Sequence, residues 1–130
     1  MKKICLFVLL FSWGIEATTV QTRWYVNIAG SATGAATSWA TACSDLQLII
    51  NNSSAGDTIW VAQGTYVPIR SANNLTVIRL NNRNNAFVLK SNVHIYGGFA
   101  GNETNLLQRN WNTNPTVLSG DIRYNRQQYG

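Results

Sequence analysis

Short stretches of alternating apolar and polar residues recur along the chain, separated by turns rich in glycine, asparagine and serine. Residues 23–28 alternate in this way, and residues 58–62 do the same between two glycine-containing turns. A period of two is typical of a β-strand, because successive side chains of a strand point to opposite faces. The pattern therefore predicts two strands, and residues 65–67 add a third after a tight corner.

One segment has a helical pattern instead. Three apolar side chains fall on one face of a helix, namely Leu46, Ile49 and Ile50. Ser44 or a neighbour can cap the N-terminus, and Asp45 adds negative charge to the first turn. The polar run at residues 51–56 ends the pattern, so we expect a short helix over about residues 45–51.

The remaining segments extend the alternation of strands and loops. Residues 30–37 are small and predict a loop, and the polar residues 68–85 predict an excursion that contains a strand of its own. Residues 87–98 return to strand character on both sides of a Ser-Asn corner, and residues 116–122 predict a final strand after a proline.

The spacing of these strands indicates a solenoid. Ile59 and Val93 are 34 positions apart, and Val93 and Val117 are 24 apart. The second spacing fits one coil of a parallel β-helix, and the first fits a coil that carries an inserted loop. Asparagine at the expected corners agrees with this interpretation, because asparagine tolerates the left-handed backbone of tight turns.

The chain also resembles a known family over about residues 24–122, through motifs that occur in order. These motifs lie at residues 39–47, 56–66, 87–90, 95–104, 108–111 and 116–122. The series resembles the N-terminal region of pectin-lyase-like right-handed parallel β-helix proteins, above all the large exported proteins of Bacteroidetes-type bacteria. The resemblance implies an all-β fold of about three coils, with residues 45–51 as a helix that caps the open end.

The first 17 residues are typical of a secretory signal peptide, since Lys2 and Lys3 precede an apolar run at residues 4–11 and a short polar stretch ends at Ala17. The run is too short to span a membrane. Cleavage leaves residues 18–130 as one exported or surface domain without a membrane span. Cys43 is then the only cysteine, so no intrachain disulfide forms and a small buried hydrophobe is the expected role.

Without the signal peptide the chain has eight Lys or Arg against four Asp or Glu. The basic residues are dispersed, whereas nucleic-acid modules cluster theirs in a stripe with stacking aromatic residues. Nucleic acid is therefore not an expected partner. Acidic polysaccharide or cell-surface components remain conceivable partners, although ordinary solvated charge explains the pattern as well.

Catalytic chemistry has few candidate groups here. The four carboxylates are Asp45, Asp57, Glu103 and Asp121, and each has a plausible role in a helix start, a turn or a loop. His94 is the only histidine, and no metal-ligand spacing, phosphate loop or nucleophile motif is present, so we expect no metal, cofactor or catalytic residue.

The candidate ligand contacts are Trp60, Tyr96, Glu103 and Asp121. Glu103 and Asp121 can form a carboxylate pair if two coils bring them together, and a sugar-stacking platform can include Trp24, Trp39, Trp60 or Trp111. For Trp60, packing is the favoured interpretation over exposure to a ligand.

Three functional hypotheses follow. The first is a non-catalytic N-terminal part of an exported β-helix protein, acting as a structural or interaction scaffold. The second is a fragment of a polysaccharide lyase or glycoside hydrolase whose active site lies on missing coils, because residues 122–130 offer no plug for the last coil. The third is a carbohydrate-binding module that uses exposed tryptophan and arginine.

Overall fold

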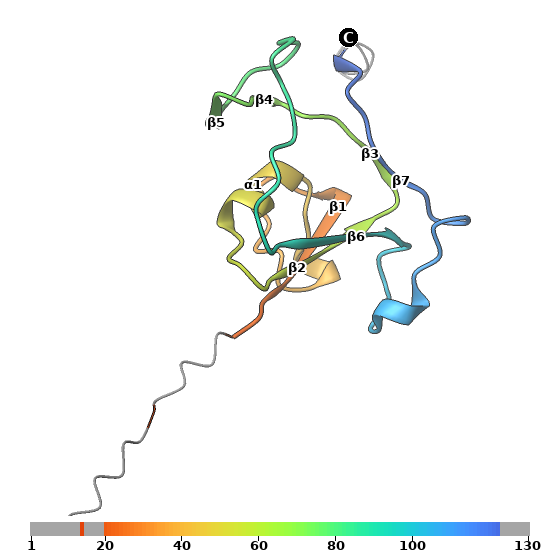
Figure 1. Cartoon of the computed structure of the whole chain (residues 1–130). Helices are drawn as coiled ribbons and strands as arrows, with labels where there is room; N and C mark the ends of the chain where they lie inside the picture. Colours follow the sequence, from red (N-terminus) through yellow and green to blue (C-terminus); the bar gives the residue numbers. More distant parts are fainter. Residues whose placement is uncertain (1–13, 15–19, 123–130) are drawn as a thin grey trace, which may run out of the picture.

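The structure is a computed structural model that describes residue 14 and residues 20–122 (Figure 1). Apart from Gly14, the signal peptide expected at residues 1–17 lies outside these residues, as does the segment 123–130. The described strands are β1 Arg23–Ser31, β2 Thr58–Ala62, β3 Gly64–Tyr66, β4 Arg70–Ser71, β5 Asn74–Ile78, β6 His94–Phe99 and β7 Thr116–Leu118. They are joined by the helix α1, Leu46–Asn52, and two 3₁₀ turns, η1 Trp39–Thr41 and η2 Leu106–Gln108.

Three parallel strands form the central sheet, in the order β1-β2-β6. Ile59 of β2 lies opposite Trp24 of β1 and Ile95 of β6 in the register of this sheet. A register shift in β2 between Trp60 and Ala62 ends the regular pairing with β6. Beyond this irregularity β3 turns away and pairs with β7 in a separate two-stranded parallel sheet.

The predicted right-handed parallel β-helix is wrong. The described strands form three small separate sheets, one of three strands, one of two and an antiparallel pair of β4 with β5, and they do not stack into repeated coils. The polar excursion folds back on itself, because Arg70 lies opposite Ile78 in the antiparallel pair. The expected strand at 87–90 is also absent, and Leu89 there is 65% exposed.

A buried glutamine explains why residues 87–90 do not join a sheet. Gln47 of α1 is 1% exposed, and its side-chain amide binds the backbone of Val88 twice. Gln47 Nε2 donates to the Val88 carbonyl at 3.1 Å, and the Val88 N–H donates to Gln47 Oε1 at 2.9 Å. The Gln47 side chain thus satisfies the N–H and C=O groups of Val88 that would otherwise pair with a neighbouring strand. The unequal spacings of 34 and 24 positions therefore reflect different loops, not coils of different length.

The predicted helix is confirmed, with a shift of one residue at its start. Asp45 is the N-cap, and its Oδ1 accepts from the Leu48 N–H at 3.0 Å. The apolar face of α1 packs against β1 and β2 in a core formed by Val26, Cys43, Leu46, Ile49, Ile50, Ile59 and Val61. Full burial of each such aliphatic side chain is worth about 1.5–3 kcal/mol, so this face of the central sheet contributes much of the stability.

Aromatic side chains cover the other face of the central sheet. Trp60 is 2% exposed and stacks on Phe99 with ring centroids 4.6 Å apart. Tyr25 contacts both Trp39, at 4.9 Å, and Trp60, at 5.8 Å between centroids. Strand β2 is consequently buried on both sides, which is why four of its five residues are buried.

Cys43 is fully buried in the core and is a free thiol. Its sulfur lies 3.5 Å from the Ala32 carbonyl oxygen and accepts from the Asp45 N–H at 3.4 Å. Burial raises the pKa of this thiol above its ordinary value. The expected role of Cys43 as a small buried hydrophobe is confirmed. Within residues 20–122, the structure contains no helix long and apolar enough to span a membrane.

Candidate functional site

Glu103, one of the expected ligand contacts, is used by its own loop. The side chain is 9% exposed, and its carboxylate accepts three backbone N–H groups. These come from Ala100 at 2.5 Å, Gly101 at 2.9 Å and Asn102 at 3.0 Å. Burial raises the pKa of this carboxyl, but the amide hydrogen bonds outweigh burial and hold the pKa below its usual value.

The backbone of Glu103 has a second structural partner. Its carbonyl oxygen accepts from the indole Nε1 of Trp39 at 2.9 Å. Trp39 belongs to the aromatic cluster behind the central sheet, so the Glu103 loop is fixed both by its own carboxylate and by this contact. The arrangement organises a loop and leaves little of the carboxylate for a ligand.

Asp57 has an equivalent role at the start of β2. Its carboxylate accepts from the backbone N–H groups of Thr22 and Ser54 and from the indole N–H of Trp24, each at 2.9 Å. Burial raises the pKa of Asp57, and these three donors lower it further than burial raises it. The turn role expected from the sequence is therefore correct, and the carboxylate also ties the chain before β1 to β2.

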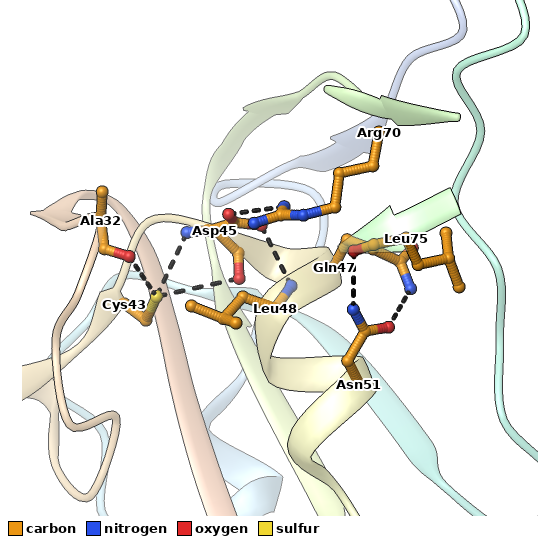
Figure 2. A network of polar contacts seen from close by, with 8 residues as sticks. All are labelled: Ala32, Cys43, Asp45, Gln47, Leu48, Asn51, Arg70 and Leu75. Atoms are coloured by element: carbon orange, nitrogen blue, oxygen red, sulfur yellow. Dashed lines mark hydrogen bonds and ion pairs between the residues drawn. The ribbon is translucent and has the colours of Figure 1, made fainter. Parts of the chain in front are cut away.

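Asp45 combines its capping role with a buried ion pair (Figure 2). Nη1 of Arg70 lies 2.6 Å from Asp45 Oδ2, and both side chains are less than one-tenth exposed. Figure 2 shows Arg70 reaching from β4 onto the helix start, beside the contacts of Asn51 with Gln47 and Leu75. The ion pair therefore joins the polar excursion to α1.

Asp121, the fourth carboxylate, is exposed after β7, and its backbone N–H donates to Ser119 Oγ at 3.1 Å. The sequence left open a carboxylate pair of Glu103 and Asp121, adjacent across a coil. The described strands form no such coils, and the Glu103 carboxylate is turned into its own loop. Among the described residues, no group of three His, Cys, Asp or Glu side chains is placed to hold a metal ion.

The two aromatic candidates have different environments. Trp60 is buried beneath Arg23, whose guanidinium carbon lies 4.0 Å from the ring centroid, so it does not face a ligand. It packs against Phe99 and Trp39, in agreement with the packing that the sequence analysis favoured. Tyr96 is half-buried on β6 and lies in a roughly parallel arrangement with the exposed His94, at 6.4 Å between centroids.

Arg109 and Trp111 complete a cluster around Tyr96. The guanidinium carbon of Arg109 lies 5.2 Å from the Tyr96 ring centroid and 5.5 Å from that of Trp111. Trp111 is 64% exposed, so a large aromatic surface reaches solvent here. We call Tyr96, Arg109 and Trp111 the arginine–aromatic cluster.

The sequence analysis included Trp111 among the sugar-stacking candidates but did not connect it with Arg109 or Tyr96. The Gln-Arg-Asn-Trp motif at 108–111 was the available signal, since it places a guanidinium two residues from an indole.

A glycine holds this cluster against β6. Gly98 has a φ of +91°, and a Cβ at this position would lie 3.0 Å from the Trp111 nitrogen. The Asn110 N–H donates to the Gly98 carbonyl at 2.7 Å, so the backbone before Trp111 lies directly on the end of the strand. The Gly98 N–H in turn donates to Thr116 Oγ1 at 3.0 Å. The two glycines that follow Tyr96 therefore serve close backbone approach to Trp111 and Thr116.

Comparisons with known proteins supply no further assignment: no protein-family model matches the chain, and neither a curated protein nor a solved structure is significantly similar to it.

Proposed function

We propose that this chain is a non-catalytic structural or interaction scaffold within an exported protein. The observation that supports this proposal is the use of three carboxylates, Asp45, Asp57 and Glu103, by the fold itself. Hydrolytic and eliminative chemistry on polysaccharides needs acidic or basic groups that face a substrate, commonly as a pair of carboxylates. Here the carboxylates face backbone N–H groups, an indole and a buried guanidinium.

Export is the second part of the proposal, and it rests on the sequence pattern of residues 1–17. Expression of the full chain in a secreting bacterial host, followed by intact-mass measurement of the exported product, tests this part. We expect a product that lacks about the first 17 residues. An intracellular product that retains Met1 would refute export and leave the scaffold role to be tested separately.

The scaffold role is tested by comparing stability with activity. Carboxylates that hold the fold stabilise it, whereas catalytic groups often reduce stability because their sites are strained or unsatisfied. We therefore expect Asp57→Asn and Glu103→Gln to lower the melting temperature. Neither the wild type nor the variants should release reducing ends or unsaturated products from a panel of neutral and acidic polysaccharides.

The opposite result identifies an enzyme. Turnover by the wild type that disappears in Glu103→Gln, together with an unchanged or raised melting temperature, would refute the scaffold proposal. Leu107→Gln serves as the matched control, because this side chain is 90% exposed in the same loop region and carries no charge.

A further inference from the structure

Among the described residues, the cation of the arginine–aromatic cluster has no acidic partner. Arg109 lies within about 6 Å of two ring centroids, the range in which a guanidinium is attracted to the face of an aromatic ring. The ion pair that the structure contains within residues 20–122 joins Arg70 to Asp45, and Arg109 forms none there. Its planar group therefore has N–H donors left for an anion outside these residues.

The neighbouring indole provides an apolar platform. Trp111 is 64% exposed, although tryptophan usually buries most of its large surface in a folded chain. An exposed indole beside a guanidinium can contact the apolar C–H face of a ring while the arginine binds a charged substituent of the same ring.

The cluster is also held in place before any ligand arrives. The 3₁₀ turn η2 has a capping box at its N-terminus, in which the Asn105 side chain accepts from the Leu107 N–H and the Gln108 side chain accepts from the Asn105 N–H. After Trp111, the Asn110 side chain accepts from the N–H groups of Asn112 and Thr113. A preorganised loop loses less conformational entropy on binding than a mobile one does.

We propose that Arg109 and Trp111, supported by Tyr96, form a binding site for a glycan that carries sugar carboxylates. The indole stacks on the pyranose ring, and the guanidinium binds the carboxylate at the edge of that ring. A single guanidinium matches a singly charged carboxylate, whereas a phosphate is usually bound by several cations or by an array of backbone N–H groups. Without the signal peptide, the eight Lys or Arg against four Asp or Glu give a formal net charge of +4, which favours the approach of an acidic polymer in general.

A matched pair of probes separates the two parts of this recognition. Cellouronate and cello-oligosaccharides of equal length share one backbone and differ in carrying a carboxylate or a hydroxymethyl group. Isothermal titration of the full chain should show tighter binding of cellouronate by about tenfold, the factor that one charge-assisted bidentate contact provides. Equal affinities for the two probes would overturn the proposal.

Substitutions identify the site. We expect Arg109→Gln to weaken cellouronate binding by about tenfold and to leave binding of the neutral probe nearly unchanged. Trp111→Ala should weaken both probes. Arg79→Gln is the matched control, because Arg79 is an exposed arginine that follows β5 and lies outside the cluster.

Two results would show that binding depends on overall charge alone. One is an equal loss of cellouronate affinity in Arg79→Gln and Arg109→Gln, and the other is unchanged affinity in Trp111→Ala. Thermal melting of each variant accompanies the titrations, so that a loss of folding is recognised as such. Arg109→Lys, which keeps the charge but lacks the planar fork, should recover only part of the discrimination between the probes.

Discussion

Replacing Glu103 with glutamine isolates the effect of its negative charge, because the two side chains have nearly the same shape. In the wild type, one carboxylate oxygen accepts from Ala100 N–H and the other from Gly101 and Asn102 N–H. A glutamine has one acceptor oxygen, and its NH₂ group must then face a backbone N–H. At least one hydrogen bond is lost, and the remaining bonds no longer have a charged acceptor.

The size of the effect follows from these contacts. A hydrogen bond to a charged group contributes roughly 1.5–3 kcal/mol, and an unsatisfied buried donor costs a similar amount. We therefore expect Glu103→Gln to lower the free energy of unfolding by about 3 kcal/mol. For a domain of about 100 residues, this corresponds to a fall in melting temperature on the order of 10–20 °C.

The dependence on pH makes the test specific for charge. The pKa of Glu103 in the folded state lies below the ordinary value of 4.5, so the carboxylate stabilises the fold fully above that pH. This contribution is lost as the pH falls through the lowered pKa of the folded state. Urea denaturation at a series of pH values should show a constant difference between wild type and variant from pH 7 to about pH 5, and a shrinking difference in stronger acid.

Three outcomes would refute this reasoning. A Glu103→Gln variant as stable as the wild type at neutral pH would mean that the carboxylate does not organise the loop. A stability difference that persists in strong acid would assign the loss to shape and not to charge. A comparable loss in the control Leu107→Gln would show that any change in this region is destabilising.

Three further predictions concern other parts of the fold. Gly98→Ala should destabilise the protein by about 2–3 kcal/mol in urea denaturation, because alanine is strained at a φ of +91° and its Cβ would press on the Trp111 backbone; a loss below about 0.5 kcal/mol would contradict this. Arg70→Met should lower the free energy of unfolding by about 3–5 kcal/mol, because it leaves Asp45 charged and buried. A double variant with Asp45→Asn should lose less stability than the sum of the two single variants, and additive losses would argue against direct coupling. Cys43 should not react with a thiol reagent in the native protein at neutral pH but should react after denaturation, whereas rapid native labelling would mean that the core opens there.

Local patterns predicted the local elements well. The helical spacing of Leu46, Ile49 and Ile50 located α1, because an isolated apolar stripe on a short helix must pack against the core. The alternation around Ile59 located β2 and placed Trp60 on the opposite face. Alternation could not tell that Trp60 would be covered by aromatic side chains from β1, η1 and β6, since that contact depends on how distant segments meet.

The hydrophobic patterns could not predict how the strands assemble into sheets. Two strands separated by 24 positions are compatible both with a repeated coil and with unrelated loops of similar length. The strand pairings decide between them, because β6 pairs with β2 in the central sheet whereas Val117 of β7 pairs with Thr65 of β3 in a separate sheet. Gln47 lies next to the apolar face of the helix, and nothing in its sequence position indicated that its side chain would be buried against the backbone of Val88.

At the candidate site, too, contacts between neighbouring residues could be predicted and contacts between distant segments could not. The structural roles of Asp45 and Asp57 could be predicted from a helix start and a turn, because capping and turn formation involve neighbouring residues. The three N–H donors of Glu103 also lie in its own loop, but the left-handed backbone of Gly101 that arranges them was not evident from composition. Arg109 and Tyr96 come from different segments, and their contact follows from the close approach at Gly98.

The parallel pairings have a consequence for the order in which the chain folds. Arg23 pairs with Thr58, Thr58 with His94, and Gly64 with Thr116, so each strand of the two parallel sheets meets a partner 35 to 52 positions away. Contacts between such distant segments form slowly, because the entropy of closing a long loop is lost before the contact is gained. The strand β3 leaves β2 early in the chain but has no partner in its sheet until β7 has been synthesised. Among the described strands, the β3–β7 sheet is therefore the last that can form during synthesis, and its pairing spans the longest loop in the fold.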